Sequence, residues 1–582
     1  MNVTGKNRRA ISADIADTGG TADREPMVEH ERAQPKFDDV FELIGKLGCG
    51  QILIYVFIIA IETNIGLCML YVIFEMANPG WTCPIPGTAR KEITDNATGI
   101  SIAVTVYKSC PLNDEALRKC PNRTFVNKYD TVLTEWDLVC DRAYISKMIA
   151  TMFFAAQLVG ALIAGQVSDR IGRRIPILVV WLAMMILQTC LGFTGYWQIY
   201  AALRVLVGVC VGALVSVTCV LPMEQLGPKW RTLVSYRIGW HIAPMLLALF
   251  AYLCRENWRY LTFVTGSFGI IFYPFVFFLM PESVRWLVQK GKFNQAETCI
   301  RRLAKQNCKP VPEDLSFLKD IKKQDDVDSK MRQGYTYIDL FRTPKIAVRT
   351  LILLLVWATA SCFSYVLNIK MSEFSGTTVY MNLVISGVAQ LLVRSSVIFL
   401  INRLGRKRSF LLYVSVAGLC MIIIMILDLV GILRQYSYLV TAFALAGLSA
   451  NAGTWSCNHV MTVEMYPTLM RNIGTSAGNM AARVGAMIAP QLKTLRITPY
   501  IILGCLAIIS GFLVFAFLPE TLGKPMPEAL PPGKLNCYKR CCRWKKTMNV
   551  TDDVKEQNVE ERSPTSGDGK NMLLHGPKVT TV

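Results

Sequence analysis

The chain has 582 residues, of which 52% are hydrophobic, a mean hydropathy of +0.35 and a formal net charge of +20. This apolar balance excludes an ordinary soluble protein of this size and indicates a polytopic membrane protein. Most of the basic residues flank apolar stretches, so we attribute the positive charge to membrane orientation and expect no nucleic-acid partner.

Residues 1–49 are polar and lack a short apolar core before a small-residue cleavage site, so we expect a cytoplasmic tail and no removable signal peptide. Twelve apolar stretches of about 20 residues follow, each long enough to span a bilayer. They lie near 50–74, 145–166, 175–194, 199–221, 233–253, 260–280, 347–368, 381–401, 409–431, 437–460, 472–492 and 499–518.

These stretches predict an all-α membrane protein with twelve transmembrane helices in two six-helix bundles. The expected units are an N-terminal bundle over 50–280, a cytoplasmic linker over 281–346, a C-terminal bundle over 347–518 and a cytoplasmic tail over 519–582. The short loops after spans 2, 4, 8 and 10 carry ten Lys or Arg, against six in the short loops on the other side. This bias predicts that both termini are cytoplasmic.

The loop over 75–144 has the features of an extracellular segment. It contains N-x-T sequons at Asn96 and Asn122, which are glycosylated only on the lumenal side. It also contains an even number of cysteines, which indicates two disulfides with three possible pairings. These cysteines are Cys83, Cys110, Cys120 and Cys140.

Three short patterns in the first half recur in the second. Asp169 in GQVSDRIGRR corresponds to Asn402 in INRLGRKR, 233 residues later. EQLGPKWR begins at Glu224 and EMYPTLMR at Glu464, an offset of 240 residues, and PES at 281–283 returns as PET at 519–521, an offset of 238. The consistent offsets indicate a duplicated six-helix bundle, which is the major facilitator architecture with a substrate cavity between the halves.

The repeated patterns predict a latch in which ion pairs between helices form in one conformation and break in the other. Gly165 allows close helix approach, and the charged residues lie at the cytoplasmic rim. The alternative is that the arginines serve only to orient the helices. The proposed gating residues are Gly165, Asp169, Arg170, Gly172, Arg173, Arg174, Glu224, Arg231, Glu464 and Arg471.

GQVSDRIGRR resembles the signature loop of the major facilitator superfamily. Four further segments resemble the organic cation, anion and carnitine transporter family over about residues 40–530: TEWDLVC (134–140), PESVRWL (281–287), DLFRTP (339–344) and EMYPTLMRN (464–472). The resemblance implies polyspecific transport or exchange of small organic ions by alternating access at the plasma membrane. It implies neither a cofactor nor a metal.

The resemblance also indicates whether the substrate is positively or negatively charged. Cation-carrying members typically have aspartate at the position of Arg483, whereas anion and carnitine carriers have arginine. Cation carriers tend to have glutamate at the position of Gln390, and anion carriers have a buried lysine at that of Arg394. Organic anions are therefore favoured, with organic cations or a carnitine-like zwitterion as alternatives.

Charge supports the same preference, because two guanidinium groups inside the membrane attract a carboxylate or sulfonate that they can bind bidentately. The alternative is that Glu62 on span 1 neutralises one of them, and the single remaining charge would then suit a zwitterion. Tyr365, Phe363 and Trp240 are expected to add an aromatic wall, although each could equally be ordinary packing. Trp357 is a further candidate for this wall.

His241 is expected to be a buried histidine with its hydrogen bonds satisfied, with proton coupling as the alternative.

We find no glycine-rich nucleotide loop, H-E-x-x-H or G-x-S-x-G, so no enzyme is predicted; a non-transporting sensor of the same fold is an alternative. In the C-terminal tail, KLNCYKRCCRWKK (534–546) suits contact with anionic membrane lipid, with a plain solvated basic tail as the alternative, and Thr580, Thr581 and Val582 form a PDZ-type ending.

Overall fold

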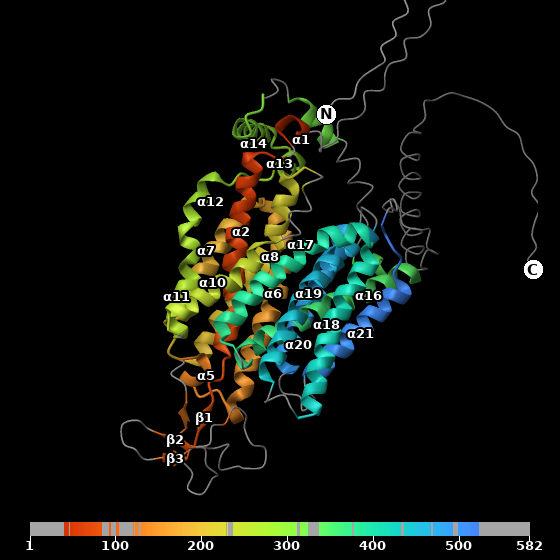
Figure 1. The fold of residues 1–582 in the computed structure, drawn as a ribbon. Helices are drawn as coiled ribbons and strands as arrows, with labels where there is room; N and C mark the ends of the chain where they lie inside the picture. The colour runs from red at the N-terminus through yellow and green to blue at the C-terminus, as the bar shows by residue number, and fades with distance from the viewer. Residues whose placement is uncertain are drawn as a thin grey trace, which may run out of the picture.

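A computed structural model describes residues 40–45, 47–83, 92–94, 101–103, 107, 120, 123–126, 130–227, 230, 237–255, 257–310, 315–323, 337–374, 377–431, 436–466, 470–492 and 499–522. Over these ranges the protein is an all-α membrane protein with the major facilitator fold, as predicted. Two helical bundles lie next to each other, and the first carries a cap of short helices at one end and a small β-containing loop at the other (Figure 1).

The helices of the first bundle coincide with the first six predicted spans. They are α2 (Cys49–Leu70) continued by α3 (Val72–Glu75), α6 (Ala143–Ile171), α7 (Arg174–Leu191), α8 (Trp197–Gln225), α10 (Gly239–Leu253), and the broken helix α11 (Trp258–Ser267), η4 (Phe268–Ile271) and α12 (Tyr273–Leu279).

The helices of the second bundle coincide with the other six spans. They are α16 (Pro344–Ile369) extended by η6 (Lys370–Glu373), α17 (Val379–Arg403), α18 (Arg406–Leu429), α19 (Ser437–Met465), α20 (Arg471–Leu492) and α21 (Pro499–Phe517). In the described part of the chain, nine helical segments are long and apolar enough to cross a membrane, and Gly239–Leu253 is a shorter apolar helix.

Helices within each bundle approach closely at glycines. A Cβ on Gly212 of α8 would lie 2.0 Å from the carbonyl oxygen of Gln157 on α6, and a Cβ on Gly485 of α20 would lie 2.0 Å from that of Ala358 on α16. Because lipid provides no hydrophobic driving force between helices, such close backbone contact supplies much of the packing energy. These contacts hold each bundle together as a unit.

The linker folds back onto the first bundle. Its helices α13 (Val284–Gln289) and α14 (Phe293–Gln306) form a separate apolar cluster with α1 (Val40–Ile44), and η5 (Tyr337–Phe341) leads into α16. Asn307 ties the cluster to α2, since its Oδ1 accepts from the backbone N–H of Gly50 at 2.9 Å and its Nδ2 donates to the carbonyl of Ile44 at 2.7 Å. We call this side of the molecule the linker end.

The opposite side, the loop end, carries the segment between α3 and α6. Its elements are β1 (Trp81–Thr82), which pairs antiparallel with β4 (Thr124–Phe125), β2 (Glu92–Thr94), which pairs with β3 (Ser101–Ala103), α5 (Val132–Glu135) and η2 (Cys140–Arg142).

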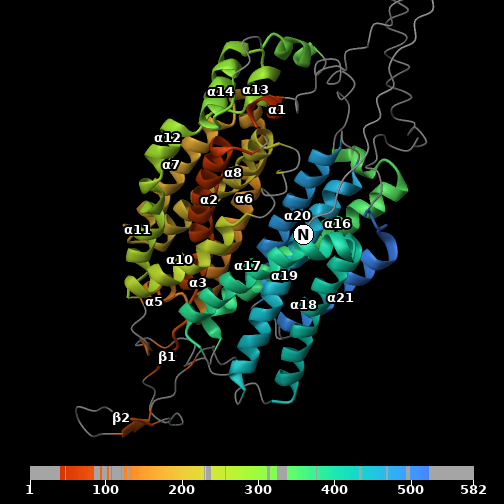
Figure 2. The same ribbon diagram turned by 45° about the horizontal axis from the view of Figure 1, so that its top comes forward.

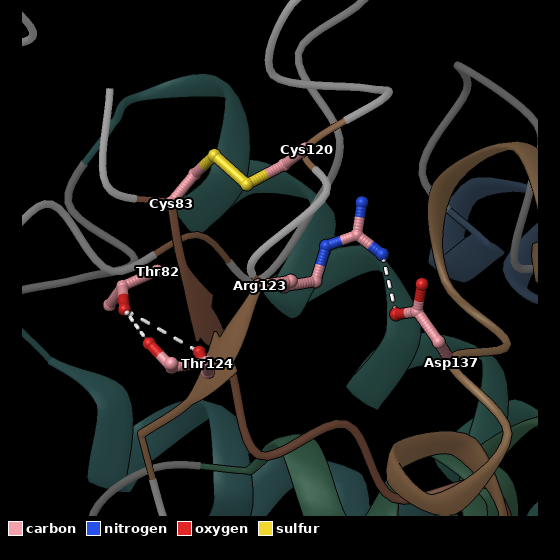
Figure 3. The surroundings of a disulfide bond; sticks show 6 residues. All are labelled: Thr82, Cys83, Cys120, Arg123, Thr124 and Asp137. Atoms are coloured by element: carbon pink, nitrogen blue, oxygen red, sulfur yellow. Dashed lines mark hydrogen bonds and ion pairs between the residues drawn. A yellow bond between two sulfur atoms is a disulfide. The ribbon is translucent and has the colours of Figure 1, made fainter. Parts of the chain in front are cut away.

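A disulfide between Cys83 and Cys120 closes this loop beside the β1–β4 pair (Figure 3). Next to it, Arg123 forms an ion pair with Asp137 at 2.6 Å and lies over the ring of Trp81 at 4.6 Å. Cys140 is also disulfide-bonded, and Cys110, Asn96 and Asn122 lie outside the described residues. The Cys83–Cys120 bond thus selects one of the three pairings that the sequence left open.

We expect Gly212→Val to destabilise the first bundle, because its side chain would have to enter space that the α6 backbone occupies. Overpacking of this kind costs about 1–3 kcal/mol or more, so the melting temperature and yield of the purified protein should fall. Gly195→Ala is the matched control, since nothing lies within 4 Å of a Cβ there. An unchanged melting temperature for Gly212→Val would contradict the close α6–α8 packing.

Candidate functional site

Four charged residues approach one another where the two bundles meet, and we call them the central charge cluster: Glu62 on α2, Arg237 just before α10, Arg394 on α17 and Arg483 on α20. Arg237 donates from Nε to Oε1 of Glu62 at 2.8 Å, and the Glu62 side chain is only 4% exposed. Glu62 is therefore bound by an arginine of its own bundle.

Arg237 was not among the predicted site residues. It lies inside the stretch 233–253 that the sequence marks as a span, and a charge in that position is the signal that would have identified it. Its guanidinium also lies 5.4 Å from the ring of Trp240, one helical turn further along, in a cation–π arrangement. Trp240 thus borders the cluster through Arg237.

Arg394 faces the first bundle from α17. Its charge acts electrostatically on Glu62, His241 and His459, which places it near both α2 and α10 as well as near α19. Gln390, one turn earlier, donates to the hydroxyl of Ser386 at 2.6 Å. Both Gln390 and Arg394 are partly exposed although they lie in the middle of a helix.

Arg483 links the two bundles directly. Its Nη1 donates to Oε1 of the fully buried Gln157 on α6 at 2.7 Å, and it interacts with the hydroxyl of Tyr365 on α16. Both of these partners are neutral. Arg483 is itself partly exposed. A guanidinium stays protonated at physiological pH, so Arg483 retains a positive charge at the interface between the bundles.

The aromatic candidates fall into two groups. The ring of Tyr365 packs 4.6 Å from that of Phe154 across the interface, and its hydroxyl contacts the sulfur of Met69 at 3.8 Å. Phe363 is 1% exposed and packs toward Gly447 on α19, on a different side of α16. Trp357 is also buried, and its Nε1 donates to Thr462 at 3.0 Å.

His241 differs from the expectation that its hydrogen bonds are satisfied. It is 3% exposed, and neither ring nitrogen has a hydrogen-bond partner among the described residues. Its neighbour on the other bundle is Gly387 of α17, where a Cβ would lie 2.9 Å from the His241 carbonyl oxygen. The ring is thus held by close packing of α10 against α17, beside the charge of Arg394.

The side chains that join the bundles lie from the middle of the helices toward the loop end. Besides Gln157 and Arg483, they include Thr151, which accepts from Gln491 at 3.0 Å and donates to the carbonyl of Met487 at 3.4 Å. At the linker end of α6, nothing lies within 4 Å of a Cβ on Gly165, and the Asp169 side chain is 71% exposed. The bundles are therefore closed at the loop end and apart at the linker end of α6.

The predicted gating residues form a network at the linker end of the first bundle. Gly172 ends α6 with a φ of +120°, and Glu282 then accepts from the backbone N–H groups of Arg173 at 2.8 Å and Arg174 at 3.2 Å. The Arg173 side chain binds Glu224 at 3.2 Å and Asp169 at 2.5 Å. Burial lowers the pKa of Arg173, but these carboxylates outweigh it and raise the pKa.

The second bundle repeats this network at the offsets found in the sequence. Gly405 has a φ of +92°, and Glu520 accepts from the backbone N–H groups of Arg406 at 2.9 Å and Lys407 at 3.1 Å. The Arg406 side chain binds Glu464 at 2.9 Å. In both bundles a carboxylate thus occupies a helix N-terminus, where free N–H groups and the helix dipole favour negative charge.

Sequence reasoning recognised the repeat but assigned no role to Glu282, Glu520 or Arg406. Of the other gating candidates, Arg170 is exposed, and Arg174 donates from Nη2 to the carbonyl of Phe277 at 2.5 Å. Arg231 lies outside the described residues, and Arg471 begins α20. Each network joins helices of a single bundle.

Comparison with known proteins agrees with this architecture. The family model described as "Sugar (and other) transporter" matches residues 114–530. The inward-open xylose transporter XylE of E. coli has the same fold, with a TM-score of 0.56 at 16% identity; the match covers 82% of this chain and 98% of that one.

Curated relatives define the family more closely. An organic cation transporter protein of Drosophila melanogaster is 29% identical, over 86% of this chain and 94% of its own length. Human solute carrier family 22 member 13 is 31% identical, over 71% of this chain and 73% of its own length. Organic anion transporter 3 of Oryctolagus cuniculus is 33% identical, over 69% of this chain and 74% of its own length. The chain therefore belongs to the sugar (and other) transporter family of the major facilitator superfamily and, within it, to the organic cation, anion and carnitine transporters.

Proposed function

We propose that this protein carries small organic anions across the plasma membrane by alternating access. The observation that supports this most is the balance of the central charge cluster, whose three arginines and one glutamate sum to a net charge of +2. A positive charge within a membrane helix costs about 2.5–3.5 kcal/mol even on lenient scales. An anionic substrate between the bundles would offset that cost.

The pairing of Glu62 supports an anion over a zwitterion. Had Glu62 bound Arg394 or Arg483, one positive charge would have remained for the substrate. Because Glu62 is held by Arg237 at 2.8 Å and the hydrogen-bond partners of Arg483 are the neutral Gln157 and Tyr365, the positive charge on α20 remains for cargo. Curated relatives are named for organic anions and for organic cations with carnitine, so their names leave the sign open.

A carnitine-like zwitterion is the second candidate. Its carboxylate would bind Arg483, and its quaternary ammonium would lie against the ring of Tyr365, which is beside Arg483. The partly exposed Arg394 would then face an ammonium group, which makes this fit poorer than that of an anion. A sensor that binds without transport would keep the same fold and the same binding residues, so it is distinguished from a carrier by measuring flux.

For orientation, we propose that the loop end is extracellular and the linker end cytoplasmic, with both termini inside. The Cys83–Cys120 disulfide supports this, since such bonds form and persist in oxidising compartments. In that orientation the bundles meet on the extracellular side, so the structure corresponds to an inward-facing state. The PDZ-type ending and the basic, cysteine-containing tail stay predictions outside the described residues.

The two linker-end networks suit a mechanism in which each bundle moves as a body. They fix the ends of α6, α7 and α8 to one another, and likewise those of α17, α18 and α19, so rotation between bundles need not bend the helices. This differs from a latch that breaks in every cycle, because the carboxylate contacts lie inside one bundle.

Replacing Arg483 should reduce anion uptake even where the amount of folded protein at the cell surface is unchanged. A charge-assisted hydrogen bond is worth about 1.5–3 kcal/mol, so we expect Arg483→Gln to lower the uptake efficiency for a labelled p-aminohippurate-like anion roughly 10- to 150-fold. Arg483→Lys should retain part of it. Surface-corrected uptake in intact cells measures this, with dicarboxylate, carnitine and tetraalkylammonium as competitors.

Arg255→Gln is the matched control, because Arg255 is an exposed arginine outside the cluster. The anion proposal fails if Arg483→Gln transports the anion normally. The anion proposal also fails if the wild-type protein transports tetraalkylammonium in preference to the anion. If the protein binds the anion but does not transport it, the sensor is favoured.

The Glu62–Arg237 pair should behave as a buried ion pair. Glu62→Gln leaves the Arg237 charge without its carboxylate, and breaking a buried pair costs about 3–5 kcal/mol. The double variant Glu62→Gln with Arg237→Gln should recover much of this loss. Thermal unfolding of the purified protein provides the measurement, and equal stability of the single variant and the wild type would argue against the pair.

The linker-end carboxylates should make a pH-dependent contribution to stability. Burial raises the pKa of Glu520, but its four backbone N–H donors outweigh burial and lower the pKa below the ordinary value of 4.5. Its stabilising contribution is therefore complete above pH 4.5 and is lost as the pH falls through the lowered pKa. Glu520→Gln should lower the melting temperature at neutral pH and remove this part of the acid sensitivity.

Glu297→Gln on α14 is the control for this experiment. Glu297 forms an exposed pair with Arg301, and such pairs contribute about 0–1 kcal/mol. If Glu520→Gln changed the melting temperature as little as Glu297→Gln at neutral pH, Glu520 would not hold the start of α18.

A further inference from the structure

A pocket in the second bundle lies beside the arginine-bearing helix α17, and none of its lining residues belongs to the central charge cluster. It is formed by α17, α18 and α19, which lie next to one another in the second bundle (Figure 2), and has a volume of about 630 Å³. This size is within the range of small-molecule sites. The pocket opens toward the lipid-facing surface, where Ile385, Leu412, Val416 and Tyr438 are each more than 40% exposed.

The lining is apolar and carries no charge among its described residues. One wall is a strip of small side chains along α19, in which Ala442, Ala446 and Ala450 recur every fourth residue and therefore lie on one face. Such a strip forms a flat surface. An uncharged, flat and apolar molecule fits it better than a phospholipid headgroup or an organic ion.

One polar group in the lining lacks a partner. Asn382, in the first turn of α17, is 0% exposed; its Oδ1 accepts from Thr377 at 2.5 Å, but its Nδ2 has no hydrogen-bond partner in the described structure. The hydroxyls of Tyr413 and Ser449 are bonded to Ser396 and to the Leu445 carbonyl. A buried donor without a partner is unfavourable, so a ligand oxygen that accepts from it would be favoured.

The dimensions narrow the class of ligand. The pocket extends along α17 from Asn382 to Val393, which is about 16 Å of helix. A volume of 630 Å³ over that length gives a mean cross-section of roughly 40 Å². This cross-section is broader than that of one extended hydrocarbon chain, which favours a ligand with a wider, flat body.

We propose that this pocket binds a membrane sterol, with its hydroxyl oxygen accepting from Nδ2 of Asn382 and its ring system lying on the alanine strip of α19. The single oxygen would then be near the loop end of the bundle and the apolar body nearer the membrane centre. The site is separate from the central charge cluster and takes a neutral lipid, not the transported ion.

The position of the pocket also gives it an effect on transport. Ala389 and Val393 line it, and the next residues along α17 are Gln390 and Arg394 of the candidate substrate site. α17 in turn packs against α10 of the other bundle at Gly387. A sterol would therefore support the helix that carries Arg394, and this second effect alone rests on the proposed transport function.

The test uses the purified full chain in lipid nanodiscs with a photoreactive sterol analogue, followed by mass-spectrometric mapping of the labelled residues. We expect saturable labelling of α17, α18 or α19 at the pocket, competed by unlabelled sterol but not by a fatty acid or diacylglycerol. Ala446→Phe fills the space over the strip and should reduce this labelling at least tenfold. Asn382→Ala removes one hydrogen bond and should weaken sterol competition about fivefold.

Leu419→Phe is the matched control, because Leu419 is 57% exposed on α18 and does not line the pocket. The proposal is overturned if Ala446→Phe and Asn382→Ala, both monodisperse, label like the wild type, or if a fatty acid competes as well as sterol. Cross-links between two copies at α19 would also overturn it. These binding results hold whatever the protein transports, and an effect of sterol on uptake in reconstituted vesicles tests the coupling separately.

Discussion

The structure depends most on how four charged side chains are accommodated within the membrane. An isolated guanidinium there is unfavourable, so each must have a carboxylate, polar partners, water or cargo. Arg237 forms an ion pair with Glu62, and Arg483 donates hydrogen bonds to the neutral oxygens of Gln157 and Tyr365.

The first bundle contains another buried arginine, Arg204. It lies 3.2 Å from Glu75, and its guanidinium lies 4.2 Å from the ring of Phe153. That pair is internal to the first bundle and fixes helix packing, whereas the central cluster lies where the two bundles meet.

Arg204 and Arg483 differ in how the structure accommodates their charges. Arg204 has its counter-charge, an aromatic neighbour and a backbone carbonyl, that of Cys68 at 3.1 Å, and it is 1% exposed. Arg483 has neutral partners and remains partly exposed where the other bundle faces it. A sequence shows both as arginines in apolar helices. Only the three-dimensional arrangement shows that Arg204 is paired with a carboxylate, whereas the hydrogen-bond partners of Arg483 are neutral.

Sequence patterns determined the fold well. All twelve stretches correspond to helices, because about 20 consecutive apolar residues leave a membrane chain few alternatives. The offsets near 233, 238 and 240 residues predicted two equivalent bundles, and the networks around Arg173 and Arg406 repeat in the structure. Composition also predicted the loop disulfides, although only the structure selected Cys83 with Cys120.

The site was harder to predict, because it depends on pairings between distant helices. Arg394 and Arg483 were predicted as site residues from their position in apolar stretches, whereas the partner of Glu62 was not predicted. Arg237 lies 175 residues from Glu62, just before α10, and although its place inside an apolar stretch marks it as unusual, the sequence does not show that it pairs with Glu62. The packing of Phe363 toward α19 and the unpartnered ring of His241 likewise depend on neighbours that one sequence does not reveal.

The unequal charge of the two bundles bears on how cargo would move. The first bundle contributes the neutral Glu62–Arg237 pair, whereas the second contributes Arg394 and Arg483. In the proposed mechanism an anion would therefore be held chiefly by the second bundle, and Gln157 of the first would be its competitor for Arg483. The Nε2 group of Gln157 has no hydrogen-bond partner among the described residues and could donate to the same anion. If an anion replaced the Gln157 oxygen as the partner of Arg483, a direct hydrogen bond between the two bundles would be lost. Binding of the anion would then make it easier for the bundles to rotate relative to each other, so binding and rotation would be coupled at this contact.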